Sequence, residues 1–285
     1  MFAIMGVTGK VGGAAARQLV ADGQPVRVIV RDAAQGRPWA AQGCEVAVAT
    51  LDDGGTSLAE AFAGAAGVFA MLPPQFDPAP DFASARTMIA GLRAALDTAR
   101  PERLVVLSTI GAEARQPNLL NQLGLLEAAL GDLPARTSFL RAAWFMDNAA
   151  GDLAGARSGV IRSHLQPLDR AIPMVAAEDV GATVAALLRE HGAPRIVELE
   201  GTQVSPDDIA AAFARALGHP VRTEAVPRDG WEAEFRAAGM TNPLPRMQMI
   251  DGFNQGWIAF GADGAGSRKG VRSLDEVIAA IVARG

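Results

Sequence analysis

Short apolar segments recur along the first half of the chain. They are rich in valine, isoleucine and leucine; they are Phe2–Met5, Val26–Val30, Val46–Val48, Gly67–Met71 and Leu104–Leu107, followed by Thr137–Leu140. Segments of this length and composition are typical of strands that are buried on both faces of a sheet. The pattern therefore predicts a central sheet whose two faces are covered.

Amphipathic stretches separate these segments. From Ser84 to Arg100 the apolar residues recur on one face of a helix, and Pro101 ends the pattern. A leucine stripe predicts a second helix over about Asn118–Gly131. Strands that alternate with helices imply right-handed crossovers and a parallel sheet. The expected fold class is α/β, with a Rossmann-type doubly wound parallel sheet.

The alternation loosens beyond residue 150. Ser205 and Ser273 each precede acidic residues in the pattern of a capped helix start, and Glu178–Asp179 suits the first turn of another helix. The stretch Gly230–Ser267 is rich in Gly, Met, Phe and Trp and has no clear period, so we expect substrate-side or interface structure there. Within it, Asp251–Trp257 is a candidate for a pocket lid or a dimer contact.

Composition limits the classes of function. The 285 residues are 49% hydrophobic and carry a formal net charge of −5, with no dense basic run. Such a chain has no general attraction for nucleic acid or anionic membranes. The three histidines stand far apart and the single cysteine, Cys44, lies in an apolar run, so neither a metal site nor an internal disulfide is expected. The absence of a membrane-spanning run and of a basic leader predicts a cytoplasmic protein.

The sharpest motif is the glycine series Gly6, Gly9 and Gly12, which stands between the first strand and a helix that ends near Gly23. Glycines at this spacing allow a sharp turn out of the strand and a close approach of the backbone to a pyrophosphate. The helix N-terminus then offers N–H groups and the positive end of its dipole to the phosphates. The motif predicts a dinucleotide site.

The end of the second strand indicates which dinucleotide is bound. An NAD-binding chain usually has an acidic residue about 20 positions after the glycines, where it binds the ribose hydroxyls. Here Arg31 occupies that position, and a guanidinium there fits a 2′-phosphate. Lys10 in the loop adds a second positive charge, whereas Asp32 leaves room for NAD. We therefore expect NADP(H) as the cofactor.

The chain resembles the atypical short-chain dehydrogenases of the NmrA-like group, which include quinone oxidoreductases. The segments that carry the resemblance are Gly6–Gly12, Val30–Asp32, Leu107–Ala112, Leu140–Asn148, Glu178–Gly181, Val226–Pro227 and Ser273–Glu276. The segment Leu140–Asn148 is similar to the family pattern L-R-P-x-x-F-x-x-N, with Ala142 in place of the usual proline. The similarity spans most of the chain.

This resemblance implies an NADP(H)-binding Rossmann domain over residues 1–150 and a smaller, interleaved substrate lobe over residues 151–285. The nicotinamide end of the cofactor is expected in the cleft between them. The cofactor-binding positions predicted from the glycine motif and the resemblance are Gly6, Thr8, Gly9, Lys10, Val11, Gly12, Arg31, Asp52, Met71, Leu72 and Pro73.

The chain lacks the catalytic pair of ordinary short-chain dehydrogenases. It contains no tyrosine, and its only lysines are Lys10 and Lys269, so a Tyr-x-x-x-Lys pair is impossible. Two functions agree with this absence. The first is NADPH-dependent hydride transfer to a quinone or a similarly activated carbonyl compound. The second is a regulatory protein that senses NADP(H). In either case we expect the protein to bind a small molecule. The sequence is also compatible with a homo-oligomer.

Candidate catalytic residues are few. Ser108 ends the fifth strand, where its hydroxyl either orients a carbonyl oxygen or caps the strand. His164 is either a proton donor in the second lobe or an ordinary surface residue. Trp144, Phe145 and Asn148 either line a substrate pocket, with rings that stack on a flat substrate and an amide that binds its carbonyl, or belong to the core.

Overall fold

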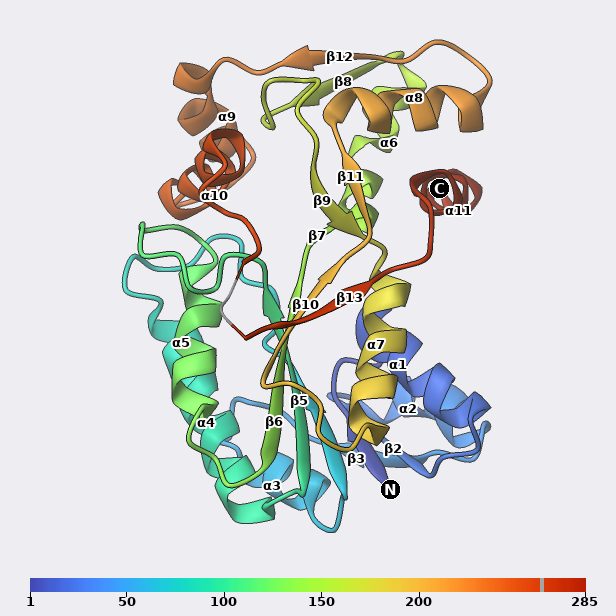
Figure 1. The fold of residues 1–285 in the computed structure, drawn as a ribbon, viewed down its shortest axis with the longest axis vertical. Helices are drawn as coiled ribbons and strands as arrows, with labels where there is room; N and C mark the ends of the chain where they lie inside the picture. The colour runs from blue at the N-terminus through green and yellow to red at the C-terminus, as the bar shows by residue number, and fades with distance from the viewer. Residues whose placement is uncertain (262–263) are drawn as a thin grey trace.

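The computed structural model describes residues 1–261 and 264–285. Within these residues, eight parallel strands form one sheet of order β13-β10-β6-β5-β4-β1-β2-β3 (Figure 1). The strands are β1 (Phe2–Ile4), β2 (Val26–Val30), β3 (Glu45–Val48), β4 (Gly67–Ala70), β5 (Arg103–Thr109), β6 (Arg136–Ala142), β10 (Ile196–Glu200) and β13 (Gly266–Lys269). This topology confirms the predicted Rossmann-type sheet.

Helices cover both faces of the sheet (Figure 1). One face carries α1 (Lys10–Ala21), α2 (Ala33–Ala40) and α7 (Ala177–Arg189); the other carries α3 (Thr56–Phe62), α4 (Ala83–Ala99) and α5 (Asn121–Leu130). Neighbouring strand residues point to opposite cores, as Ile4 faces α1 and Ala3 faces α4. Burial on both faces explains why the strands are continuous apolar runs.

Helices α1 and α7 pack closely although they are far apart in sequence (Figure 1). A methyl group built on Gly181 of α7 would lie 2.4 Å from the Cβ atom of Ala14 and 2.7 Å from the carbonyl oxygen of Val11. Only a residue without a side chain allows this approach. The start of α7, a segment beyond residue 150, therefore belongs to the environment of the glycine loop.

The remaining elements form a smaller lobe at the top of Figure 1. Its strands are β7 (Trp144–Phe145), β8 (Val160–Ser163), β9 (Ile172–Val175), β11 (Thr202–Val204) and β12 (Arg222–Ala225). Its helices are η1 (Met146–Asp152), α6 (Leu153–Arg157), α8 (Pro206–Leu217), η2 (Arg228–Gly230), α9 (Trp231–Ala237), α10 (Leu244–Gln255) and α11 (Leu274–Arg284). These elements share a separate apolar core that includes the fully buried Trp231 and Phe213.

The chain passes repeatedly between the two parts. Strands β10 and β13 lie beyond residue 150 and still extend the main sheet. A division of the chain at residue 150 stays a prediction. The expected starts of α8 and α11 have the predicted capping boxes at Ser205 and Ser273. No helix in the described ranges has the length and apolar character needed to cross a membrane.

The stretch Gly230–Ser267, whose sequence has no clear period, contains α9, α10 and the first part of β13. Ala262 and Asp263 of this stretch lie outside the described residues. Helix α10 buries residues on several sides, among them Met247, Ile250 and Phe253. Its buried residues do not follow a single helical stripe, and its sequence therefore lacks a clear period.

Candidate functional site

The glycine loop connects β1 to α1 with the geometry that a bound pyrophosphate requires. Gly6 has a φ of +68°, a conformation that favours glycine. A Cβ atom on Gly12 would lie 2.3 Å from the carbonyl oxygen of Met5 and 2.5 Å from that of Gly6. Gly12 therefore lets α1 start directly against the strand end.

The N-terminus of α1 is open to a ligand. Its N-cap residue is Gly9, so no side chain accepts a hydrogen bond from the first turn. Thr8, Gly9 and Lys10 are exposed there, whereas Val11 and Gly12 are buried beneath them. Unpaired N–H groups at the positive end of a helix dipole are suited to bind phosphate. The loop thus fits the pyrophosphate of a dinucleotide.

Arg31 and Asp32 follow β2 and have different surroundings. Arg31 is exposed, and its side chain forms no hydrogen bond or ion pair within residues 1–261 and 264–285. The carboxylate of Asp32 accepts a hydrogen bond from the backbone N–H of Ala34 at 2.9 Å and caps α2. The guanidinium is available to a ligand, while the carboxylate already has a structural role.

The predicted residues after β3 and β4 differ in their burial and contacts. The sulfur of Met71 lies 2.6 Å from the position that a Cβ atom on Gly6 would take, so Met71 packs directly on the first glycine. Leu72 is buried beneath the surface and Pro73 is exposed. Asp52 is exposed and accepts a hydrogen bond from the hydroxyl of Thr50 at 2.9 Å. The structure therefore brings Gly6 and Met71 together at the ends of two paired strands.

Lys10 has a partner that the sequence did not predict. Its ammonium lies 2.9 Å from a carboxylate oxygen of Asp147 in η1. The other oxygen of Asp147 accepts a hydrogen bond from the backbone N–H of Ala177, the first residue of α7, at 2.8 Å. Asp147 therefore connects the start of α1 with the start of α7.

Ser108 belongs to a buried polar cluster at the end of β5. Its hydroxyl donates a hydrogen bond to Glu127 of α5 at 2.5 Å. The same carboxylate is held by two hydrogen bonds from the guanidinium of Arg141, at 2.9 Å and 2.7 Å. Sequence reasoning missed Glu127, the only charged residue of α5, and Arg141, which follows the apolar pair Phe139 and Leu140 in β6.

His164 lies in the smaller lobe, directly after β8. Its ring stacks on Phe235 at 4.7 Å between centroids and meets Trp231 edge-on at 5.3 Å. Burial lowers the pKa of the imidazole, and the carboxylate of Glu234 lies 3.6 Å from Nε2. Strand β8 is far from α1 in Figure 1. The contacts of His164 are with the core of the smaller lobe, and its catalytic role stays a prediction.

The three residues predicted for a substrate pocket stand where the two parts of the molecule meet. Trp144 lies edge-on to Phe253 at 5.1 Å between centroids and packs against the core of the smaller lobe. The next residue, Phe145, packs against the core beneath α1 and α7. Asn148 is exposed. Both rings are partly buried, so the pocket and core interpretations stay open for them.

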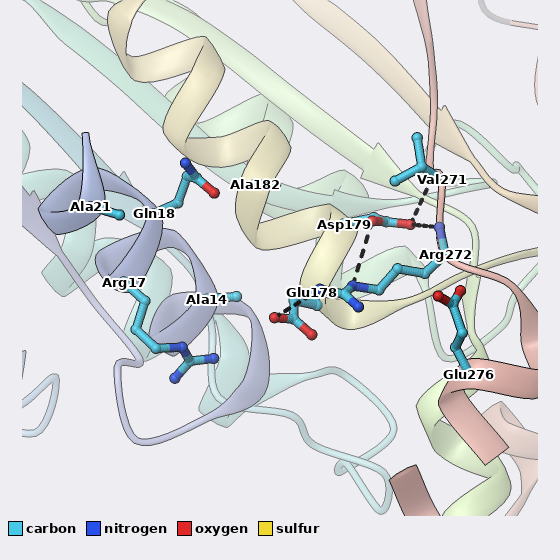
Figure 2. A pocket seen from close by; sticks show the side chains of 10 residues that line it. All are labelled: Ala14, Arg17, Gln18, Ala21, Glu178, Asp179, Ala182, Val271, Arg272 and Glu276. Atoms are coloured by element: carbon cyan, nitrogen blue, oxygen red, sulfur yellow. Dashed lines mark hydrogen bonds and ion pairs between the residues drawn. The ribbon is translucent and has the colours of Figure 1, made fainter. Parts of the chain in front are cut away.

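A cavity of about 520 Å³ lies between α1, α7 and the segment before α11 (Figure 2). Its wall has mixed charge, because Arg17 and Arg272 stand near Glu178 and Asp179. Figure 2 shows the carboxylate of Asp179 bonded to the backbone of Val271 and Arg272, at 2.8 Å and 2.9 Å. Asp179 thus anchors the C-terminal segment to α7.

A second cavity of about 470 Å³ lies between β9, β11 and the end of α10. Its lining includes Phe253, Ile258 and Phe260 from the smaller lobe. Neither cavity is lined by the glycine loop or by Arg31. The dinucleotide site therefore rests on the geometry of the loop.

Comparison with known proteins agrees with this geometry. A family model described as NAD(P)H-binding matches residues 6–191. A curated relative, the NAD(P)H azoreductase of Xenophilus azovorans, is 27% identical over 248 residues, which cover 86% of this chain and 83% of the relative. These findings confirm the predicted nicotinamide dinucleotide cofactor.

Solved structures share the fold over nearly the whole chain. Triphenylmethane reductase of Citrobacter sp. has a TM-score of 0.80 and 21% identity, and 99% of each chain is covered. The NADPH complex of a quinone oxidoreductase from Escherichia coli also has a TM-score of 0.80, with 20% identity over 99% of this chain and 100% of the other. NmrA, a negative transcriptional regulator, has a TM-score of 0.69 and 18% identity over 98% and 94%.

The family model covers more than half of the chain, and the glycine loop at its start has the geometry that the family's ligand requires. The solved structures extend the agreement to the smaller lobe. The chain belongs to the NAD(P)H-binding family and has the fold of the NmrA-like atypical short-chain dehydrogenases.

Proposed function

We propose that this protein is an NADPH-dependent oxidoreductase that transfers hydride to a quinone or a similarly activated carbonyl compound. The observation that carries the proposal is the combination of an open dinucleotide site with the absence of an available tyrosine–lysine pair. The residues at the site bind and orient the cofactor, and the acceptor must then react without strong acid catalysis from the protein.

The preference for NADPH rests on Arg31 and Asp32. A free guanidinium at the end of β2 is suited to form paired hydrogen bonds with a 2′-phosphate. Asp32 caps α2 through Ala34, so it is engaged where an NAD-binding chain would bind the ribose. Both observations favour a phosphorylated ribose over an unmodified one.

The choice of acceptor rests on which side chains near the site can donate a proton to the product. Bound NADPH supplies a hydride, and the product of a carbonyl reduction must also gain a proton. The hydroxyl of Ser108 donates to the carboxylate of Glu127, and Lys10 pairs with Asp147. A quinone becomes a phenolate, whose conjugate acid has a pKa of about 10, so it gains its proton from water without a protein acid. Quinones therefore suit this site better than simple ketones.

The relatives support this class of acceptor. An azo dye, a triphenylmethane dye and a quinone are the substrates implied by the names of the relative and of two structural neighbours. Each is a conjugated molecule that accepts electrons readily. The partly buried rings of Trp144 and Phe145 are candidates to stack on such a molecule, and the exposed Asn148 is a candidate to bind its carbonyl.

A regulatory protein that senses NADP(H) is the second candidate. It is favoured by the same engagement of Ser108 with Glu127, because a sensor needs the dinucleotide site and no proton donor. The fold of NmrA agrees with either function. Turnover separates the two candidates, since a sensor binds the cofactor without consuming it.

The test is a titration of the purified protein with NADPH and NADH, followed by NADPH oxidation against neutral quinones such as menadione. We expect tight NADPH binding and steady turnover that depends on both protein and quinone. Tight binding without turnover would favour the sensor. Failure to bind either nucleotide would contradict both candidates.

A further inference from the structure

Arg246 occupies an unusual position at the junction of the two parts of the molecule. It lies in the first turn of α10, and its guanidinium carbon stands over two aromatic rings. The distance is 5.8 Å to the ring centre of Phe76, in the loop between β4 and α4, and 5.0 Å to that of Phe235 on α9. The two rings therefore hold the guanidinium by cation–π contacts from both parts of the chain.

This guanidinium has no anionic partner. Within the described residues, the guanidinium of Arg246 forms no hydrogen bond and no ion pair. Three arginines near it in the same lobe do have carboxylate partners: Arg162 pairs with Glu234 at 2.9 Å, Arg228 with Asp251 at 2.7 Å, and Arg236 with Glu232 at 2.9 Å. Burial lowers the pKa of the Arg246 guanidinium, so its charge is partly removed from water without compensation.

The position of Arg246 relative to the sheet is that of a ligand-binding residue. The backbone oxygen of its neighbour Pro245 accepts a hydrogen bond at 2.9 Å from Leu119, in the loop that follows β5. The carboxylate of Asp77, in the loop that follows β4, accepts hydrogen bonds from the backbone of Thr241 and Asn242 at 2.8 Å and 2.7 Å. Arg246 therefore lies beyond the carboxyl ends of β4 and β5, where ligands bind in open α/β sheets.

An acidic aromatic molecule has an anionic group, which suits the guanidinium of Arg246, and a ring, which suits the ring of Phe76. A sulfonate or carboxylate has oxygens that accept paired hydrogen bonds from a guanidinium. The ring of Phe76 remains accessible to an aromatic ligand, since this residue is 57% exposed. A neutral aromatic ligand could pack on the ring but would leave the charge of Arg246 uncompensated.

We propose that Arg246 and Phe76 form a subsite for an aryl anion, so that the preferred acceptors are aromatic compounds with a sulfonate or carboxylate group. The identification of this ligand as the reduced substrate rests on the proposed function. The subsite itself depends only on residues outside the glycine loop, and its ligand binds whether or not hydride is transferred.

The first test measures binding without chemistry. The ligands are 2-naphthalenesulfonate, 2-naphthoate and the neutral 2-naphthalenemethanol, titrated by calorimetry in the presence of saturating NADP⁺. We expect at least one acid to bind at least tenfold more tightly than the alcohol. Arg246→Gln should reduce the ratio of the two affinities at least tenfold, as expected for a lost charge-assisted hydrogen bond. Arg246→Lys should keep part of the preference for the acid. The stronger of the two acids identifies the group that the subsite favours.

The matched control is Arg162→Gln, which removes a positive charge from the same lobe where a carboxylate already compensates it. This variant should keep the preference of the unaltered protein. Titration with NADPH shows that each variant is folded. Equal affinities for acids and alcohol, or the same loss in Arg162→Gln as in Arg246→Gln, would overturn the subsite.

The second test separates the subsite from the proposed function. It compares kcat/KM for 1,2-naphthoquinone-4-sulfonate and for 1,2-naphthoquinone, as a ratio within each variant. We expect this ratio to fall at least tenfold in Arg246→Gln and to stay unchanged in Arg162→Gln. Acid binding through Arg246 without reduction of either quinone would refute the proposed function and leave the subsite intact. Reduction of both quinones with a ratio that no variant alters would refute the subsite alone.

Discussion

The ammonium group of Lys10 lies 2.9 Å from the carboxylate of Asp147, although the two residues are 137 positions apart in the chain. Asp147 also accepts a hydrogen bond from the backbone N–H of Ala177, so one carboxylate joins the starts of α1 and α7. The lysine of the glycine loop is thus partly neutralised before any phosphate binds. Arg31, which has no such partner, is left as the stronger candidate for a phosphate contact.

Replacement of Asp147 by Asn should strengthen the binding of NADPH and NADH by the same factor. The change removes a negative charge near the phosphate site and leaves Lys10 unpaired, and the pyrophosphate is common to both nucleotides. The expected gain is a few-fold, because Lys10 is about half exposed and its ion pair is screened by water. Dissociation constants measured by fluorescence titration test the prediction.

The control places Asp147→Asn in a Lys10→Met background, in which most of the gain should disappear because no ammonium is left to be released. A gain confined to NADPH would instead indicate that Lys10 contacts the 2′-phosphate. Weaker binding of both nucleotides would show that Asp147 holds Lys10 in its binding position, contrary to our expectation.

The substitution Arg31→Asp should weaken the binding of NADPH far more than the binding of NADH. The guanidinium at the end of β2 is exposed and unpaired in the described structure, so its main effect is on the 2′-phosphate that only NADPH carries. Loss of charge-assisted hydrogen bonds predicts a decrease in NADPH affinity of about 10- to 100-fold. Parallel titrations with the two nucleotides provide the measurement. Equal losses would exclude a specific contact between Arg31 and the 2′-phosphate.

The sequence predicted the parts of the site that depend on local structure. The turn between β1 and α1 needs glycine at Gly6 and Gly12 for reasons of backbone geometry, and Arg31 follows from its spacing after them. Asp147 and Arg246 were missed because their roles arise from contacts between distant segments. Before the fold is known, a single Asp or Arg in a weakly periodic stretch carries no sign of such contacts.

Glu127→Ala should destabilise the protein strongly. The side chain of Glu127 is 12% exposed, accepts a hydrogen bond from Ser108 and is held by two more from Arg141, which is buried. Its removal leaves the buried guanidinium of Arg141 with Glu113, which lies 2.5 Å away and is 45% exposed, as a remaining carboxylate partner. We therefore expect a loss of about 2 kcal/mol, below the cost of a buried charge with no partner at all. Urea denaturation gives the change in the free energy of unfolding.

The matched control for this variant is Glu102→Ala. Its pair with Arg136 spans 3.6 Å between side chains that are both more than half exposed. An exposed pair of this kind contributes roughly 0–1 kcal/mol. Losses of similar size in the two variants would contradict the structural role assigned to the buried cluster of Ser108, Glu127 and Arg141.

Ionisation of the carboxyl group of Asp152, the last residue of η1, should lower the free energy of unfolding as the pH rises. Burial raises the pKa of its carboxyl from 3.8 to about 6, because the charged form is poorly solvated in the folded chain. The folded state therefore binds the proton more tightly than the unfolded state. The resulting stabilisation is fully present below pH 3.8 and is lost as the pH rises through about 6.

Asp152→Asn removes this titration and keeps the shape of the side chain. Relative to the unaltered protein, the variant should gain stability between pH 4 and pH 8, by an amount of up to ~3 kcal/mol at 1.36 kcal/mol per pKa unit. Urea denaturation at several pH values across this range measures the difference. A difference between the two proteins that stays constant with pH would show that the carboxyl titrates normally in the folded state, since only a shifted pKa makes the effect of the substitution depend on pH.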